Sequence, residues 1–399
     1  MPEAVHRRKR RRQEFSALLA VVLLAALRAA PTGRAGAAPA PAPASVSATS
    51  GAPTPAGLHP AGATAEEIRI GPGERLLVIA PHPDDETLGA GGLAQRVLER
   101  GGKVRILLLT AGDGYVDAVR QETGQSRPRA EEFIAYGERR LGEARAAARE
   151  LGRGISVETV GFPDGGLDQL LRKHMRRGEP ERSATTGASD PPYDDEALDP
   201  DLPYDGVDLR HAMARTIREA RPTIVAMPDP ADVHPDHRAT AAFSLLALGD
   251  VLAEPDRRPG PPPRVFTCLI HWPGWPPGWD RTPSPQDADL PLDRPADLPS
   301  RGLVARRLTL GAKQIAHKRS ALAQYATQVD VMPEFLGAFL RRDEVFGEIP
   351  VVDEPSLARL LATVRPAVPT APAPAALPTA SAPLATATPP GRREPTPAR

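Results

Sequence analysis

Cysteine is nearly absent from this chain, since Cys268 is the only one among 399 residues. A single cysteine excludes an intramolecular disulfide and any zinc site built from several thiolates. Cys268 lies in an apolar, β-branched run at 265–270, which favours a buried, unreactive thiol over a nucleophile. The chemistry of the chain must therefore be carried by other side chains.

A charge excess of either sign is also lacking, because 50 Lys and Arg balance 50 Asp and Glu. No global field then favours nucleic acid, and no nucleic-acid partner is predicted. The large basic cluster at 7–12 precedes an apolar stretch at 15–27 and Ala-rich sequence at 35–40. This order is typical of an export signal.

The apolar part of this signal is short for a spanning helix, which needs about 20 residues. Residues 1–30 are therefore interpreted as a cleaved signal peptide, with an uncleaved N-terminal anchor as the alternative. The prediction that follows is a secreted or extracytoplasmic protein. The anchor alternative would add a membrane tether.

Proline, with 48 residues, is concentrated at the two ends and in a few loops. Residues 31–66 form a Pro/Ala-rich linker, and residues 367–399 form a Pro/Ala/Thr-rich tail that we expect to be disordered. One folded domain is predicted between them, at 67–366. Composition is that of an ordinary globular core, with 41% hydrophobic residues.

Apolar runs alternate with helical patterns through this domain, which predicts an α/β fold. The fold class expected is a single Rossmann-like domain with a mostly parallel sheet flanked by helices. Strands are predicted at 76–80, 104–110, 155–160, 223–227 and 265–270, and helices at 88–100, 131–151, 208–220 and 238–252.

Two long segments interrupt this alternation. The insert at 162–207 is rich in Pro, Asp and Tyr, and loops of this length are usually functional or disordered. The Trp-rich loop at 271–298 holds all three tryptophans of a chain with only 4% aromatic residues. These indoles either pack the loop on the domain or form a stacking wall for a sugar ring.

Two His-Pro-Asp segments follow predicted strands and provide the candidate chemistry. The first contains His82, Asp84 and Asp85, and the second contains His234, Asp236 and His237. Ligands of open α/β sheets bind at the carboxyl ends of the strands, so both segments are well placed for a site. Helix N-cap turns with incidental histidines are the alternative.

A metal site can be assembled from these two segments. His82, Asp85 and His237 would give two imidazoles and one carboxylate, which suits catalytic zinc with an open position for water and also suits iron(II). A nearby carboxylate could accept the proton of that water. His234 would remain to stabilise an oxyanion, and Asp236 could orient the His234 ring.

These segments resemble the LmbE-like family, also called PIG-L, of zinc-dependent N-deacetylases. The resemblance covers about 75–350 and includes APHPDDETLGAGG at 80–92, RLGEARAAARELG at 140–152, GFPDGGL at 161–167, HPDHRA at 234–239 and HKRSALAQYATQ at 317–328. It implies metal ligation by His82, Asp85 and His237. It also implies Asp84 as the general base and His234 as the polarising group.

Arg140 falls where family members place an arginine that contacts substrate. The alternative is a surface pair with Glu143 on the same helix. His271 is a further candidate for a substrate contact. Asp113, Asp164 and Asp229 follow strands and could either join the site or cap turns.

The function predicted is zinc-dependent removal of an N-acetyl group from an N-acetylated amino sugar, of the N-acetylglucosamine type, in a glycan or conjugate. One alternative is hydrolysis of a different acyl group or an ester at the same site. The other is a non-catalytic glycan-binding protein with a structural metal. The presence of Asp84 favours an enzyme, because a binding protein needs no base there.

Overall fold

A computed structural model describes residues 65–254 and 260–364. The predicted signal at 1–30, nearly all of the linker at 31–66 and the tail at 367–399 lie outside the described residues. Among the helices of the described part, none has both the length and the apolar character needed to cross a bilayer.

A single eight-stranded sheet forms the centre of the domain, in the order β1-β7-β8-β6-β5-β2-β3-β4. The strands from β6 to β4 in this order run parallel, whereas β8 is antiparallel to both β6 and β7. The strands are β1 (Glu66–Glu67), β2 (Arg75–Ala80), β3 (Lys103–Thr110), β4 (Ser156–Phe162), β5 (Ile224–Pro228), β6 (Arg264–Cys268), β7 (Val304–Thr309) and β8 (Asp343–Glu348).

Strand β2 shows why the sheet is covered on both faces. Successive side chains of a strand point to opposite faces. Leu76 and Val78 accordingly join one core cluster, and Leu77 and Ile79 join the other. The continuous apolar run that predicted this strand therefore supplies both cores at once.

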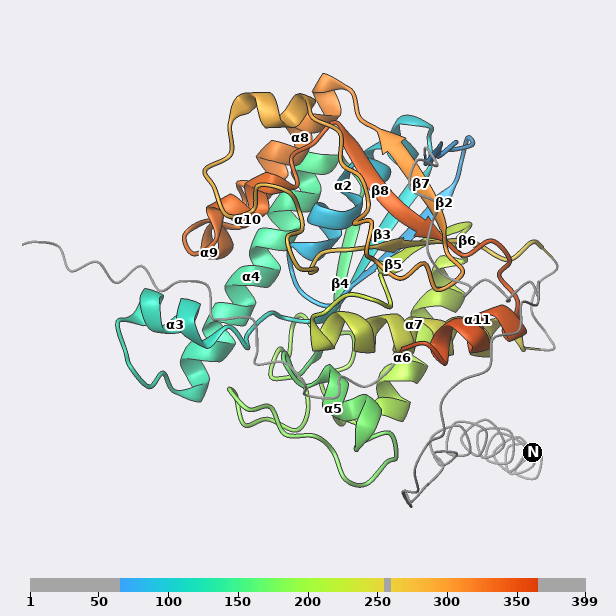
Figure 1. Ribbon diagram of the computed structural model, residues 1–399. Coiled ribbons are helices and arrows are strands. Elements are labelled where there is room, and N and C mark those ends of the chain that lie inside the picture. Colours follow the sequence, from blue (N-terminus) through green and yellow to red (C-terminus); the bar gives the residue numbers. More distant parts are fainter. Residues whose placement is uncertain (1–64, 255–259, 365–399) are drawn as a thin grey trace, which may run out of the picture. The chain divides into compact units, whose positions relative to one another are not determined.

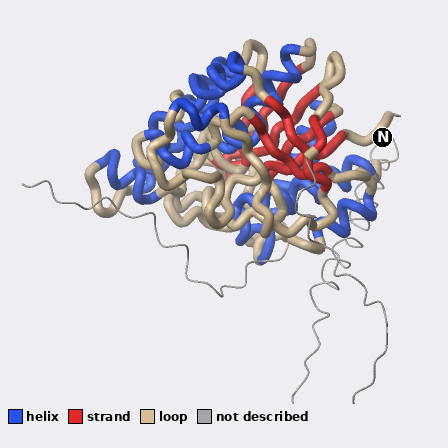
Figure 2. Tube along the Cα trace, turned by 45° about the horizontal axis from the view of Figure 1, so that its top comes forward, coloured by secondary structure: helices blue, strands red, loops and turns tan. Residues whose placement is uncertain are grey.

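Helices pack on each face of the sheet (Figures 1 and 2), with α2, α4 and α8 in contact on one side and α5, α6, α7 and α11 on the other. The predicted single α/β domain with a mostly parallel sheet is thus confirmed. The helices are α2 (Asp85–Glu99), α3 (Val116–Thr123), α4 (Ala130–Leu151), α5 (Leu167–Arg172), α6 (Gly206–Ala220), α7 (Pro235–Leu252), the short 3₁₀ helix η1 (Pro285–Asp289), α8 (Ala312–Leu322), α9 (Ala326–Val329), α10 (Pro333–Ala338) and α11 (Glu354–Leu361).

The insert at 162–207 packs beside β4. It begins with helix α5 and returns along the strand, where the backbone N–H of Leu198 donates to the carbonyl of Thr159 at 2.9 Å. Tyr193 and Tyr204 of the insert are buried, and the Tyr204 hydroxyl donates to the carbonyl of Gly161. The insert therefore covers what would otherwise be an open edge of the sheet.

The Trp-rich loop is anchored in the core by Trp275. This side chain is buried, and its indole N–H donates to the carbonyl of Leu269 at 3.2 Å. Trp272 is half-buried and donates to Asp297. Packing is therefore the role of Trp275, and a sugar-stacking wall made of all three indoles is wrong.

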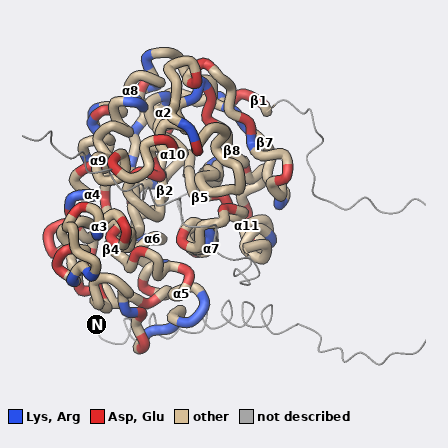
Figure 3. Tube along the Cα trace, turned by 60° about the vertical axis from the view of Figure 1, so that its left-hand side comes forward, with Lys and Arg blue, Asp and Glu red and all other residues tan. Residues whose placement is uncertain are grey.

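Acidic and basic residues are interspersed along the described chain (Figure 3). Several of them form ion pairs between elements, such as Arg105 of β3 with Glu158 of β4 at 2.7 Å.

Candidate metal centre and catalytic site

The two His-Pro-Asp segments meet at the carboxyl ends of β2 and β5, which are neighbours in the sheet. From β2 the chain continues to β3 on one side, and β5 lies on the other side of β2. This is the topological switch point at which ligands of open α/β sheets bind. The loops after β3, β4 and β6 reach the same edge of the sheet.

The turn between β2 and α2 places Asp84 in an unusual conformation. Asp84 has φ 127° and ψ −36°, a backbone conformation that residues other than glycine rarely adopt. Such backbone strain is of the order of ~1–3 kcal/mol and persists where surrounding contacts enforce it. Glu86 provides one such contact, because its carboxylate accepts the backbone N–H of Asp84 at 3.0 Å.

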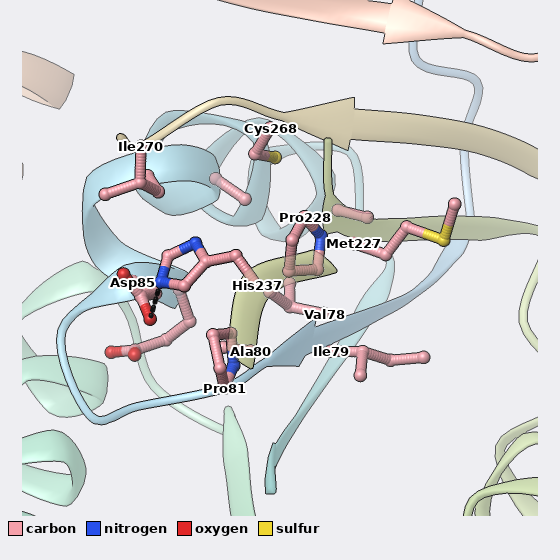
Figure 4. A pocket seen from close by; sticks show the side chains of 13 residues that line it. Val78, Ile79, Ala80, Pro81, Asp85, Met227, Pro228, His237, Cys268 and Ile270 are labelled. Carbon is pink, nitrogen blue, oxygen red and sulfur yellow. Dashed lines mark ion pairs between the residues drawn. The ribbon is translucent and has the colours of Figure 1, made fainter. Parts of the chain in front are cut away.

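A carboxylate oxygen of Asp85 lies between two histidines. Asp85 Oδ2 is 3.2 Å from His82 Nδ1 and 3.3 Å from His237 Nε2. Figure 4 shows the His237 ring, carried by the start of α7, pointing at Asp85 at the start of α2. The structure thus brings the three predicted metal ligands together.

The donor set fits a divalent ion. In the described part of the chain, neither ring nitrogen of the fully buried His237 makes a hydrogen bond of good geometry. Burial lowers the pKa of His237, but the carboxylates of Asp85 and Asp232 outweigh burial and raise the pKa to about 10. A cation placed among these carboxylates would take over the role of that proton, because metal ligation requires a neutral imidazole.

Three overlapping groups of side chains could hold an ion here. The candidate ligand atoms within each group lie within 4.8 Å of one another. The groups are His82 with His234 and His237, Asp85 with His237 and His271, and His82 with Asp164 and Asp236. The predicted set of His82, Asp85 and His237 is not itself one of these groups, and its members are divided between the first two.

Outer carboxylates orient the two predicted histidine ligands. His82 Nε2 lies 3.1 Å from Asp164 Oδ1 and 3.4 Å from Asp236 Oδ2. The prediction that Asp236 orients His234 is wrong for its side chain, which contacts His82 and accepts the backbone N–H groups of Gly165 and Leu167. The Asp236 carboxylate is thus held by the loop after β4 and by His82.

Asp232 is a site residue that the sequence analysis missed. Its Oδ2 lies 3.2 Å from His237 Nδ1, and the same oxygen accepts the backbone N–H groups of Ile270 and His271. Asp232 is fully buried. An acidic residue in the same loop as a predicted histidine ligand was the available signal.

We expect Asp232→Asn to weaken metal binding by roughly 10–100-fold, as loss of an outer-shell partner does. The amide cannot stabilise the His237 ring as the carboxylate does. Titration of the metal-free protein with zinc against a competing chelator measures the change. Asp229→Asn is the matched control, because Asp229 sits in the same loop but contacts Ala231, Thr267 and Arg294. Unchanged zinc affinity in Asp232→Asn would contradict the assigned role.

Asp84 is buried beside the metal cluster, and its environment suits a proton acceptor. Burial raises the pKa of Asp84 to about 8, and Arg140 opposes that rise. A base is most effective when its pKa lies near the working pH. A bound cation would act in the same direction as Arg140 and lower the pKa of Asp84, because an opposite charge favours the ionised carboxylate.

Arg140 is buried next to Asp84. Its guanidinium donates to the carbonyls of Gly112 and Pro83 at 2.8 and 2.6 Å, and Nη2 lies 3.3 Å from Asp84 Oδ2. The surface pair with Glu143 is therefore wrong, since Glu143 instead accepts from Thr327. Arg140 positions the turn and the carboxylate of Asp84.

Replacing Arg140 with alanine should lower the free energy of unfolding by about 3–5 kcal/mol, because it leaves the buried Asp84 carboxyl and two backbone carbonyls without their donor. Urea denaturation followed by circular dichroism measures the loss. Arg139→Ala is the matched control on the same helix, because that side chain is 49% exposed and pairs with Glu122 at the surface. A loss in Arg140→Ala no larger than in this control would contradict the account.

His234 caps helix α7. Its Nδ1 accepts the backbone N–H of Asp236 at 3.3 Å, so the proton of a neutral ring resides on Nε2. Burial and the neighbouring His237 lower the pKa of His234 well below its usual value. The ring is therefore a neutral hydrogen-bond donor.

The strand-end aspartates have separate roles. Asp164 joins the site through His82, whereas Asp229 caps its own turn and binds Arg294. Asp113 accepts the hydroxyl of Tyr193 from the insert at 2.7 Å, and burial raises the pKa of Asp113 to about 7. His271 lies against His237 and Phe335.

The family model described as "PIG-L: GlcNAc-PI de-N-acetylase" matches residues 77–248, the stretch that holds both His-Pro-Asp segments. This stretch of the chain is similar to the PIG-L family. The resemblance noted from the sequence is thereby confirmed.

Several curated relatives are named as sugar deacetylases. A 1D-myo-inositol 2-acetamido-2-deoxy-alpha-D-glucopyranoside deacetylase of Kineococcus radiotolerans is 30% identical, over 46% of this chain and 48% of the relative. One of the same name from Rhodococcus jostii is 29% identical, over 65% and 83%. The diacetylchitobiose deacetylase of Thermococcus kodakarensis is 29% identical, over 44% and 49%. The chain thus spans about half the length of some of these relatives.

Solved structures also show similarity. The A40926 pseudoaglycone deacetylase Dbv21 is 21% identical with a TM-score of 0.43, covering 70% of this chain and 99% of that one. The N,N'-diacetylchitobiose deacetylase of Pyrococcus horikoshii is 17% identical with a TM-score of 0.40, covering 69% and 84%.

Proposed function

We propose that this protein is a metal-dependent deacetylase that hydrolyses the N-acetyl group of an N-acetylglucosamine-type substrate. The observation that carries the proposal is the placement of His82 and His237 around one oxygen of Asp85, with the buried carboxylate of Asp84 in the same turn. Zinc is the ion proposed, with iron(II) as the alternative. Metal analysis of the protein as isolated distinguishes the two.

A bound divalent ion supplies Lewis acidity, which lowers the pKa of a water molecule and polarises a carbonyl. Asp84 accepts the proton of the attacking water as the new C–O bond forms. The same carboxyl then delivers that proton to the amide nitrogen, so that the C–N bond breaks and the products are acetate and a free amine. Arg140 keeps the carboxylate oriented for both transfers.

His234 is the group proposed to stabilise the oxygen of the tetrahedral intermediate. Its Nδ1 is occupied by the Asp236 backbone, which leaves the Nε2–H free to donate to the developing charge. Loss of one such donor lowers turnover by about 10²–10³. Asp236 contributes by holding His82 and the loop after β4.

An amino sugar is the proposed substrate, because the relatives are named for acetamido-glucose on inositol and for diacetylchitobiose. The test is acetate release from both compounds, compared with an O-acetylated sugar of the same skeleton. We expect the amide to be the preferred substrate. Faster hydrolysis of the ester would favour an esterase, and sugar binding without acetate release would favour a glycan-binding protein.

The proposed location is outside the cytoplasm, on the basis of the basic and apolar N-terminal pattern at 7–27. Fractionation of cells that express the full chain tests this directly. We expect the protein in the extracytoplasmic or membrane fraction, and removal of residues 1–30 should retain it in the cytoplasm. Export that persists without that segment would overturn the proposal.

A further inference from the structure

His271 lies beside the predicted metal ligands although it belongs to neither His-Pro-Asp segment. It follows β6, the strand next to β5, by three residues. Its ring centroid lies 4.8 Å from that of His237, edge to face, and 5.2 Å from that of His234. The sheet topology thus adds a further imidazole to the cluster.

Several contacts hold this imidazole in place. The backbone N–H of His271 donates to Asp232 Oδ2 at 2.9 Å, the same oxygen that lies 3.2 Å from His237 Nδ1. The carbonyl of His271 accepts the backbone N–H of Val233 at 3.0 Å. On its outer side the ring stacks on Phe335, with centroids 5.4 Å apart and planes 6° apart. One carboxylate therefore sets the positions of both His237 and His271.

We propose that His271 is a further protein ligand of the ion, bound together with Asp85 and His237. The candidate ligand atoms of these three residues lie within 4.8 Å of one another. The inference rests on the metal centre of the proposed function and adds a residue to it. Stacking on Phe335 would fix the ring plane, as outer contacts commonly do for ligating imidazoles.

A third imidazole has chemical consequences for the site. Nitrogen-rich sets favour zinc and other late first-row ions over magnesium and calcium, which prefer oxygen. With His82, His237, Asp85 and His271 as ligands, a water molecule would have to enter as a fifth ligand. Zinc accepts five ligands in some catalytic states.

The first experiment counts imidazoles on the wild-type protein. Full-length chain loaded with one equivalent of zinc is studied by X-ray absorption at the zinc edge, where imidazole multiple scattering reports the number of histidine ligands. We expect three histidines. A clear count of two would overturn the proposal while leaving the proposed function intact.

The second experiment compares cobalt(II) titrations of wild type, His271→Ala and the control His211→Ala, whose side chain is exposed on α6. In His271→Ala we expect altered ligand-field absorption bands and a loss of affinity for cobalt(II) of about 100-fold or more. Loss of a side chain that only hydrogen-bonds to a metal ligand lowers metal affinity by roughly 10–100-fold. Added imidazole should restore the wild-type spectrum. Circular dichroism confirms folding, and Phe335→Leu removes the stacking partner while keeping the imidazole.

The outcomes distinguish ligation by His271 from the proposed metal-dependent function. Cobalt spectra that coincide for wild type and His271→Ala would overturn ligation by His271, even with an active enzyme. A wild type that binds no divalent ion would overturn both this inference and the proposed function.

Discussion

Replacing Asp84 with asparagine is expected to lower the rate of acetate release by roughly 10²–10⁴-fold, the range typical of a lost general base. The amide has nearly the same shape as the carboxylate but cannot accept the water proton. Asp84 is not among the predicted ligands, so the ion should remain bound. Steady-state acetate release and metal content by mass spectrometry, measured on one preparation, test both statements.

A matched control for this substitution is Asp117→Asn, because Asp117 is an exposed residue of α3 that pairs with Arg120. Its activity and metal content should equal those of wild type. Asp84→Asn that releases acetate at a rate within a few-fold of wild type would show that another group accepts the proton. Loss of the ion in the same variant would show that Asp84 is a ligand instead.

Replacing His237 with alanine is expected to remove the ion and, with it, all measurable turnover. His237 is fully buried between Asp85 and Asp232, at 3.3 and 3.2 Å. Without the imidazole, two buried carboxylates face a cavity and the ion loses a nitrogen ligand. Metal content after supplementation, measured by mass spectrometry, should fall from one equivalent to near zero.

The control for this variant is His211→Ala, which removes an exposed imidazole of α6 that contacts none of the predicted ligands in the described part of the chain. It should keep one equivalent of metal and wild-type activity. Thermal denaturation of both variants separates metal loss from unfolding, since the folded His237→Ala protein must still show a cooperative transition. Full metal occupancy in folded His237→Ala would contradict the ligand assignment.

The central strands were predictable because their apolar character follows from burial on both faces. Strand β8 was missed because Asp343, Glu344 and Glu348 interrupt its pattern, yet all three are buried. Each is compensated by a cation from elsewhere in the chain, for example Glu344 by Lys318 at 2.6 Å. A local pattern carries no information about such distant partners.

The residues of the candidate site also fall into those that local sequence suggests and those that depend on tertiary packing. His82, Asp84 and Asp85 lie in one short segment and His234 and His237 in another, so strand-end position and spacing were enough to suggest them. The buried position of Arg140 on α4 depends on packing against the turn after β2.

Asp232 and His271 lie on the loops that follow β5 and β6. Their contact depends on the pairing of these two strands, which only the assembled sheet shows. Sequence spacing therefore suggested the ligands themselves, whereas the side chains that hold them needed the structure.

The most direct test of the account is acetate release by the purified full chain from the acetamido-glucose conjugate of inositol, before chelation, after chelation, and after zinc or iron(II) is returned. The account predicts one bound ion per chain, loss of turnover when the ion is removed, and recovery when it is restored. Acetate release that continues unchanged in protein shown to be free of metal would contradict it.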